Sequence, residues 1–117
     1  MTGAPWEAQL AAALAEAEAA YVRAAGGEAV CKLHKDGRVD GGLKYEEGRV
    51  IALRDLQRAL RAAKDAPAAG AAIVETAQAE LARWQADLET YQTQGRPLPW
   101  LAYAQGGVDA LQPFTHP

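Results

Sequence analysis

The side chains that could do chemistry in this sequence are few. Cys31 is the single cysteine, His34 and His116 are the two histidines, and serine is absent. Cys31 and His34 have the spacing of half a zinc site, but zinc takes four ligands and the sequence holds no second cluster of this kind. A glycine-rich phosphate loop and a nucleophile motif are also missing. We therefore expect no catalytic residue, no metal site and no cofactor, and the protein is not expected to be an enzyme.

Basic residues form the strongest charged feature. Arg54, Arg58 and Arg61 recur at four- and three-residue steps, which places them on one flank of a helix. Such a stripe can be a solvated face, can meet an acidic surface of a partner protein, or can contact phosphate. The net charge of -3 disfavours phosphate, because affinity for a nucleic-acid backbone grows with the number of cations brought to it. DNA contact is therefore an alternative and not the primary expectation.

Three segments carry the periodicity of amphipathic helices, at 5–25, 44–64 and 71–94. The apolar residues of the last segment alternate at three- and four-residue steps, a spacing typical of packed helix pairs. The short connection at 65–70 predicts that this helix folds back on the preceding one as an antiparallel pair. Because most apolar residues are alanines, the core is expected to be thin.

A short antiparallel β-hairpin is predicted at about 29–43, between the first two helices. Asp36-Gly37 suits a two-residue reversal, and the flanking residues partly alternate between apolar and polar. Two strands alone are marginal in water, so we expect the hairpin to lie on a helix or on a neighbouring subunit. Its basic side chains would then be charges at the rim of a contact; they are Lys32, Lys35 and Arg38.

Residues 96–117 are predicted to form an extended arm. The segment is rich in proline and glycine, and no helical or strand period is sustained along it. Disordered tails usually lack large apolar residues, whereas this one has several, so it is expected to bind its own body or a neighbour. The side chains expected to make that contact are Leu98, Trp100, Tyr103 and Phe114. The predicted fold is thus a mainly α (α+β) domain over 1–95 followed by this arm, whose removal would leave the domain folded.

The order of helix, Lys-Asp-Gly-Arg hairpin and amphipathic helix resembles the small head-tail joining proteins of tailed bacteriophages, of the lambda protein W type. The residues that carry the resemblance are "VCKLHKDGRV" at 30–39 and "LRDLQRAL" at 53–60, within a stretch of about 10–64. The helix at 71–94 and the arm have no counterpart in that family. The resemblance implies a structural virion subunit that forms a homo-oligomeric ring, dodecameric by analogy, on the portal or on neighbouring neck and tail proteins.

Location follows from other features of the sequence. A single cysteine gives no sign of an oxidising compartment, and no apolar run is long enough to span a membrane. We therefore expect synthesis in the cytoplasm, of the host if the protein is then built into a virion. Two further alternatives to the connector stay open: another virion-assembly protein or helical protein-interaction module, and a small regulator that contacts nucleic acid through the arginine stripe.

Overall fold

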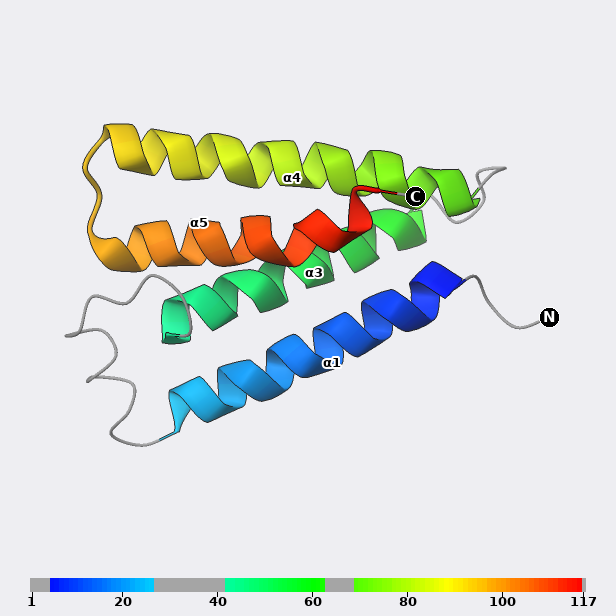
Figure 1. Ribbon diagram of the computed structural model, residues 1–117, viewed down its shortest axis with the longest axis horizontal. Coiled ribbons are helices and arrows are strands. Elements are labelled where there is room, and N and C mark those ends of the chain that lie inside the picture. The colour runs from blue at the N-terminus through cyan, green and yellow to red at the C-terminus, as the bar shows by residue number, and fades with distance from the viewer. Residues whose placement is uncertain (1–4, 27–41, 63–68, 117) are drawn as a thin grey trace.

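A computed structural model describes residues 5–26, 42–62 and 69–116, and helices account for nearly all of them (Figure 1). The elements are α1 (Pro5–Ala25), α3 (Leu43–Ala62), α4 (Ala69–Thr93), α5 (Leu98–Leu111) and a short 3-10 helix, η1 (Gln112–Phe114). Each α-helix runs antiparallel to the one before it in this order (Figure 1). As a result α3 and α5 point in the same direction.

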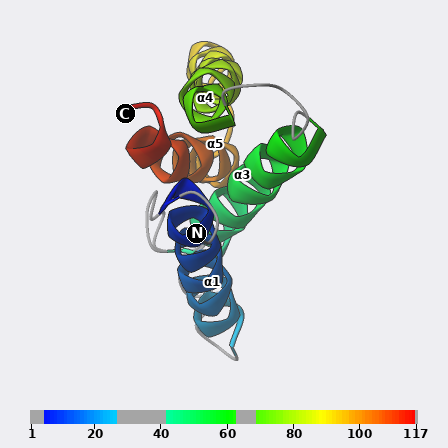
Figure 2. The same cartoon turned by 90° about the vertical axis from the view of Figure 1, so that its right-hand side faces the viewer.

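The α3–α5 pair forms the centre of the molecule. These two helices make the most extensive contact, α1 packs on α3, and α4 packs mainly on α5 with a smaller contact to α3. Figure 2, seen along the helices, shows α5 and α3 between α1 on one side and α4 on the other. The largest fully buried side chains are Leu53, Leu56 and Leu111, which belong to this central pair.

Glycines allow α3 and α5 to approach until their backbones touch. A Cβ atom on Gly48 of α3 would overlap the carbonyl of Tyr103, and one on Gly106 of α5 would overlap the carbonyl of Tyr45. The next residue, Gly107, faces the other neighbour, because a Cβ there would overlap the indole ring of Trp84 on α4. Gly106 and Gly107 thus let α3 and α4 pack closely against α5.

The predicted helices at 5–25, 44–64 and 71–94 correspond to α1, α3 and α4. Their apolar positions also agree with the core: Leu10 and Ala17 of α1, Val50 of α3 and Trp84 of α4 are buried. The predicted pairing of the last two helices is only partly right. α4 does run antiparallel to α3, but its main partner is α5.

The α+β class is wrong, because the described residues are all-α and contain no strand. The hairpin predicted at 29–43, with Lys32, Lys35 and Arg38, lies outside the described residues except at its end. There, Leu43 begins α3 instead of ending a strand. Asp36-Gly37 and partial alternation were the whole basis of the strand prediction, and both are local signals of short range.

The extended C-terminal arm is also wrong, because residues 98–111 form α5. Pro97 and Pro99 occupy the start of this helix, where a residue without an N–H group costs nothing. Gly106 and Gly107, which look like helix breakers in the sequence, are the residues through which α5 packs. The chain therefore does not divide into a domain over 1–95 and a separate arm.

Candidate interaction surface

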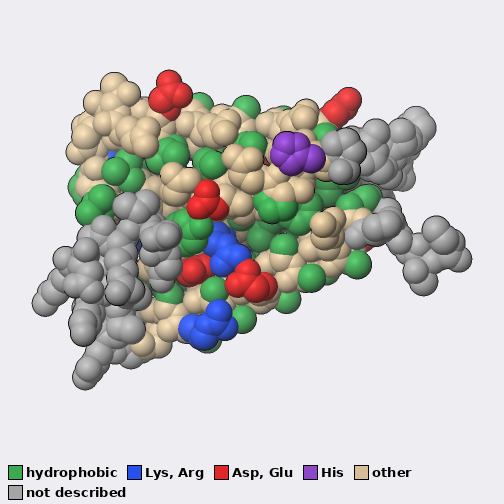
Figure 3. All heavy atoms as spheres, viewed as in Figure 1, with side chains coloured by type: hydrophobic (Ala, Val, Ile, Leu, Met, Phe, Trp, Pro, Cys, Tyr) green, Lys and Arg blue, Asp and Glu red, His purple; other side chains and the backbone are tan. Residues whose placement is uncertain are grey.

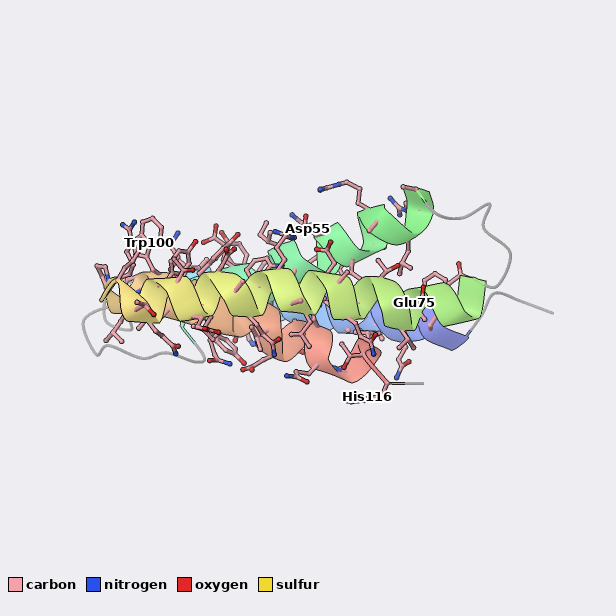
Figure 4. All side chains as sticks on the ribbon, turned by 90° about the horizontal axis from the view of Figure 1, so that it is seen from above. Asp55, Glu75, Trp100 and His116 are labelled. Atoms are coloured by element: carbon pink, nitrogen blue, oxygen red, sulfur yellow. The ribbon has the colours of Figure 1, made fainter. Side chains whose placement is uncertain are left out.

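A groove of about 380 Å³ opens on the surface where the end of α4 and the starts of α3 and α5 meet. We call it the Trp100 groove; its lining residues are Lys44, Glu47, Tyr91, Pro99, Trp100 and Tyr103. Trp100 is 46% exposed, and Leu98, two residues earlier in α5, is 41% exposed. Figure 4 shows Trp100 pointing outward at one end of the molecule, on the side opposite His116.

A tight turn between α4 and α5 sets the position of Trp100. The N–H of Arg96 donates to the carbonyl of Tyr91 at 2.9 Å, and the N–H of Gly95 donates to the carbonyl of Gln92 at 3.2 Å. This pair of bonds is a Schellman motif, and Gly95 supplies the positive φ of 65° that the motif needs. α5 then starts at once, so Trp100 lies within one helical turn of its beginning and next to the last turn of α4.

Aromatic contacts anchor the floor of the groove to the core. The rings of Tyr91 and Trp100 are 5.3 Å apart with an angle of 81° between their planes, which is the favourable edge-to-face arrangement. Tyr103 is half-buried, and its ring lies 5.2 Å from that of the buried Trp84. These ring contacts hold the walls of the groove in place, although the indole ring of Trp100 is half exposed to solvent.

Two cations border the groove. The guanidinium of Arg96 lies 4.7 Å from the centre of the Trp100 ring and donates to the side-chain carbonyl of Gln94 at 2.8 Å. Lys44 forms an ion pair with Glu47 at 2.9 Å. Lys44 is thus neutralised within α3, whereas Arg96 has no carboxylate partner among the described residues.

A second groove, of about 420 Å³, lies between α1, α3 and α5. Figure 3 shows acidic and basic side chains gathered over its middle, with hydrophobic side chains on either side. Arg49 of α3 forms ion pairs with Glu16 of α1 and, at 2.6 Å, with Glu46 of its own helix. Tyr45 donates a hydrogen bond to Asp109 of α5 at 2.6 Å. These contacts tie three helices together.

The pKa shifts in this second groove agree with a structural role. The hydrogen bond from Arg49 lowers the pKa of Glu16, which keeps this carboxylate charged. Burial alone would lower the pKa of Arg49, but its hydrogen bonds to Glu16 and Glu46 outweigh burial and raise it. Burial and the hydrogen bond to Asp109 raise the pKa of Tyr45, so its hydroxyl stays a donor. None of these groups is prepared to exchange a proton near neutral pH.

The arginine stripe lies on the outer side of α3, but its cations differ in their partners. Arg54 pairs with Glu18 of α1 at 2.9 Å, and Arg58 pairs with Asp55 at 3.2 Å. Arg61 is exposed and forms no ion pair with another described residue. Two of the three cations are therefore partly neutralised by the protein itself.

The four apolar residues of the predicted arm separate into two sets. Leu98 and Trp100 are exposed at the start of α5, whereas Tyr103 is half-buried and Phe114 is 5% exposed in the core. The structure thus brings Trp100 and Tyr103 together in the groove at the start of α5. Phe114 lies in η1, beyond the other end of α5.

The predicted contact residues do not include Tyr91 and Arg96, the two residues that contact the Trp100 ring. Tyr91 falls on the apolar face of the helix predicted at 71–94, and its edge contact with Trp100 arises only once α5 turns back on α4. Arg96 was not singled out. The signal that was present is Gln-Gly-Arg-Pro at 94–97, in which glycine follows a helical period and proline comes two residues later, a common helix ending.

Within the ranges that the structure describes, no three His, Cys, Asp or Glu side chains are grouped so that they could hold a metal ion. Nor does any helix there have the length and apolarity to cross a membrane.

No family model matches the sequence, and neither a curated protein nor a solved structure matches it. The chain's own surfaces therefore carry the functional conclusion.

Proposed function

We propose that this protein is a non-catalytic binding subunit that holds a partner protein at the Trp100 groove. The observation that carries the proposal is the half-exposed indole of Trp100, packed edge-to-face on Tyr91 and covered on one side by Arg96. Trp, Tyr and Arg are the residues that most often dominate the binding energy of protein interfaces. Anchored rings also lose little conformational freedom when a partner binds, which favours affinity.

The alternative of a nucleic-acid regulator has less support. It depends on Arg54, Arg58 and Arg61, and the first two are engaged by carboxylates of the same chain. Binding phosphate would require those ion pairs to break, and the net charge of -3 would oppose the approach of a polyanion.

The head-tail connector of a tailed phage is our narrower proposal within this class. The sequence resemblance at 30–39 and 53–60 supports it, and α3, which contains the second stretch, is central to the fold. Because α5 is part of the body, the ring contacts would come from exposed surfaces such as the Trp100 groove and not from a free arm. Negative-stain imaging with candidate portal rings tests this proposal; a chain that stays monomeric and off every ring contradicts it.

Photo-crosslinking tests the broader proposal of a protein-binding groove. A benzophenone amino acid replaces Lys44, which lines the groove with a partly exposed side chain, or, as a control, the exposed Ala79 on α4. In cells that make the native protein, we expect a discrete protein adduct from position 44, lost when Trp100→Ala is added, and none from position 79. Equal adducts from both positions, or none from position 44, would contradict a partner at the groove.

A further inference from the structure

We infer that the partner presents a short, extended, proline-rich segment with an acidic residue beside the prolines, and that this segment occupies the Trp100 groove. The inference rests on the proposed function of the groove and adds the chemistry of its ligand.

The walls of the groove suit proline. Tyr91, Trp100 and Tyr103 supply three aromatic rings, and Pro99 supplies a fourth apolar ring surface. The planes of Tyr91 and Trp100 differ by 81°, so together they form a step and not a flat plate. Polyproline segments dock on aromatic-lined grooves of this kind, because their preformed helix loses little entropy and their rings stack on the aromatic faces.

The size of the apolar surface excludes larger occupants. Among the described residues the exposed large hydrophobic side chains are Val22, Leu98 and Trp100, and Val22 belongs to a different groove, between α1 and α3. An amphipathic helix needs a longer row of apolar contacts, and a stable dimer buries roughly 800 Å² on each partner. One exposed indole, that of Trp100, in a groove of about 380 Å³ fits a peptide of a few residues instead.

Polar groups at the groove match an extended backbone. A polyproline helix leaves its carbonyl groups without internal hydrogen bonds. Tyr103 lines the groove, and its hydroxyl has no hydrogen-bond partner among the described residues, so we expect it to donate to such a carbonyl. Burial, with smaller effects of Glu47 and Asp55, raises the pKa of Tyr103, which keeps this donor protonated.

The charge at the border of the groove predicts that the residue beside the prolines of the ligand is acidic. Arg96 lies over the Trp100 ring and is bound only by the neutral amide of Gln94, so its charge is available to a ligand. On the α3 side, Lys44 and Glu47 neutralise each other. The border of the groove is therefore net positive at Arg96, and an Asp or Glu next to the prolines would pair with it.

Fluorescence anisotropy with three labelled peptides tests the inference. The first peptide is Glu-Pro-Pro-Leu-Pro-Pro, the second replaces Glu by Lys, and the third replaces every proline by alanine while keeping Glu. We expect the first to bind most tightly, the second about two- to fivefold more weakly through loss of one exposed ion pair, and the third not measurably. Arg96→Gln should remove the difference between the first two peptides, and Trp100→Ala should abolish binding.

Matched controls keep the result interpretable. Arg58→Gln removes an exposed arginine of α3 outside the groove and should leave the affinity unchanged. Circular dichroism during urea unfolding shows whether Trp100→Ala is still folded, and Trp100→Phe, which keeps an aromatic ring, should retain part of the affinity. Equal binding of the alanine peptide, or a preference for the Lys peptide, overturns the inference.

The peptide experiment can fail without the proposed function failing. If no peptide binds but position 44 still gives an adduct that depends on Trp100, a partner occupies the groove and its chemistry is not the one inferred. If neither the peptides nor the crosslinker find a ligand, both the inference and the proposed function fall.

Discussion

Gly106 is the residue at which the fold depends most directly on the absence of a side chain. Its Cα faces the carbonyl of Tyr45 on α3, and an added methyl group would overlap that oxygen. Intrinsic helix propensity would favour alanine at this position by about 1 kcal/mol. Helix propensity therefore predicts that Gly106→Ala stabilises the protein, whereas packing predicts that it destabilises the protein.

We expect Gly106→Ala to lower the free energy of unfolding by about 1–3 kcal/mol, because backbone atoms cannot move aside cheaply. Urea unfolding followed by circular dichroism measures the change. Ala79→Gly, at an exposed position of α4, calibrates the propensity effect in this protein and should cost about 1 kcal/mol. A Gly106→Ala variant that is more stable than wild type would contradict the close contact of α3 and α5.

Arg49 and its two carboxylates give a prediction with a pH dependence. Glu16 is largely exposed, so Glu16→Gln should cost less than about 1 kcal/mol at neutral pH. Because Arg49 holds the pKa of Glu16 below its ordinary 4.5, this contribution is fully present above pH 4.5 and is lost as the pH falls through the lower, folded-state pKa. The stability difference between wild type and Glu16→Gln should therefore shrink toward zero in acid, as measured by urea unfolding between pH 7 and pH 2.5.

Arg49→Gln is the matched comparison. It should cost more than Glu16→Gln at pH 7, because it leaves Glu46, whose side chain is only 10% exposed, without its ion-pair partner. Equal costs for the two substitutions, or a Glu16→Gln effect that does not change with pH, would mean that this ion pair does not link α1 to α3 energetically.

Helix α5 is the element that sequence reasoning described least well, although α1, α3 and α4 were placed within two residues of their bounds. Regular spacing of Leu53, Leu56 and Leu60 is a strong helical signal that depends on one helix alone. The prolines and paired glycines of α5 are weak helix formers in isolation, and their value lies in contacts with α3 and α4 that no local pattern contains. Tertiary packing, in this case, overrides local propensity.

The same reason explains the missed part of the groove. Trp100 was recognised as an apolar side chain in need of a contact, but Tyr91 and Arg96 join it only through the turn at Gly95. For the arginine stripe, the sequence predicted the local arrangement but not the partners. Its helical spacing was correct, whereas its ion pairs to Glu18 and Asp55 depend partly on the position of another helix.

Removal of α5 provides the test at the scale of an element. A chain that ends at Gly95 loses the helix that makes the most extensive contact with α3 and exposes Leu53 and Leu56, so we expect it to lose cooperative unfolding altogether. Thermal melting followed by near-UV circular dichroism reports the loss of fixed packing. A chain that ends at Thr115 retains α5 and η1 and should still melt cooperatively. A sharp transition in the shorter chain would restore the picture of a detachable arm.

At the scale of the whole molecule, the charged groove contributes to stability, and the Trp100 groove is the proposed surface for recognition. The charged groove is crossed by Arg49 and Tyr45, whose contacts join α1, α3 and α5. The Trp100 groove lies where α4 turns into α5 and carries an exposed ring with an unpaired guanidinium beside it. Substitutions in the first should mainly change the free energy of unfolding. Arg96→Gln should change binding and leave stability nearly intact, whereas Trp100→Ala should abolish binding and also cost the edge-to-face contact with Tyr91.

The parallel course of α3 and α5 has a consequence for how the chain is made. Parallel neighbours need a crossover, so α3 waits for its closest partner until the whole of α4 and the turn at Gly95 have been synthesised. During translation, the part of α3 that packs on α5 is therefore open to water until α5 has left the ribosome. This interval is when a nascent chain would most need a chaperone, and slowing synthesis before residue 98 would prolong it.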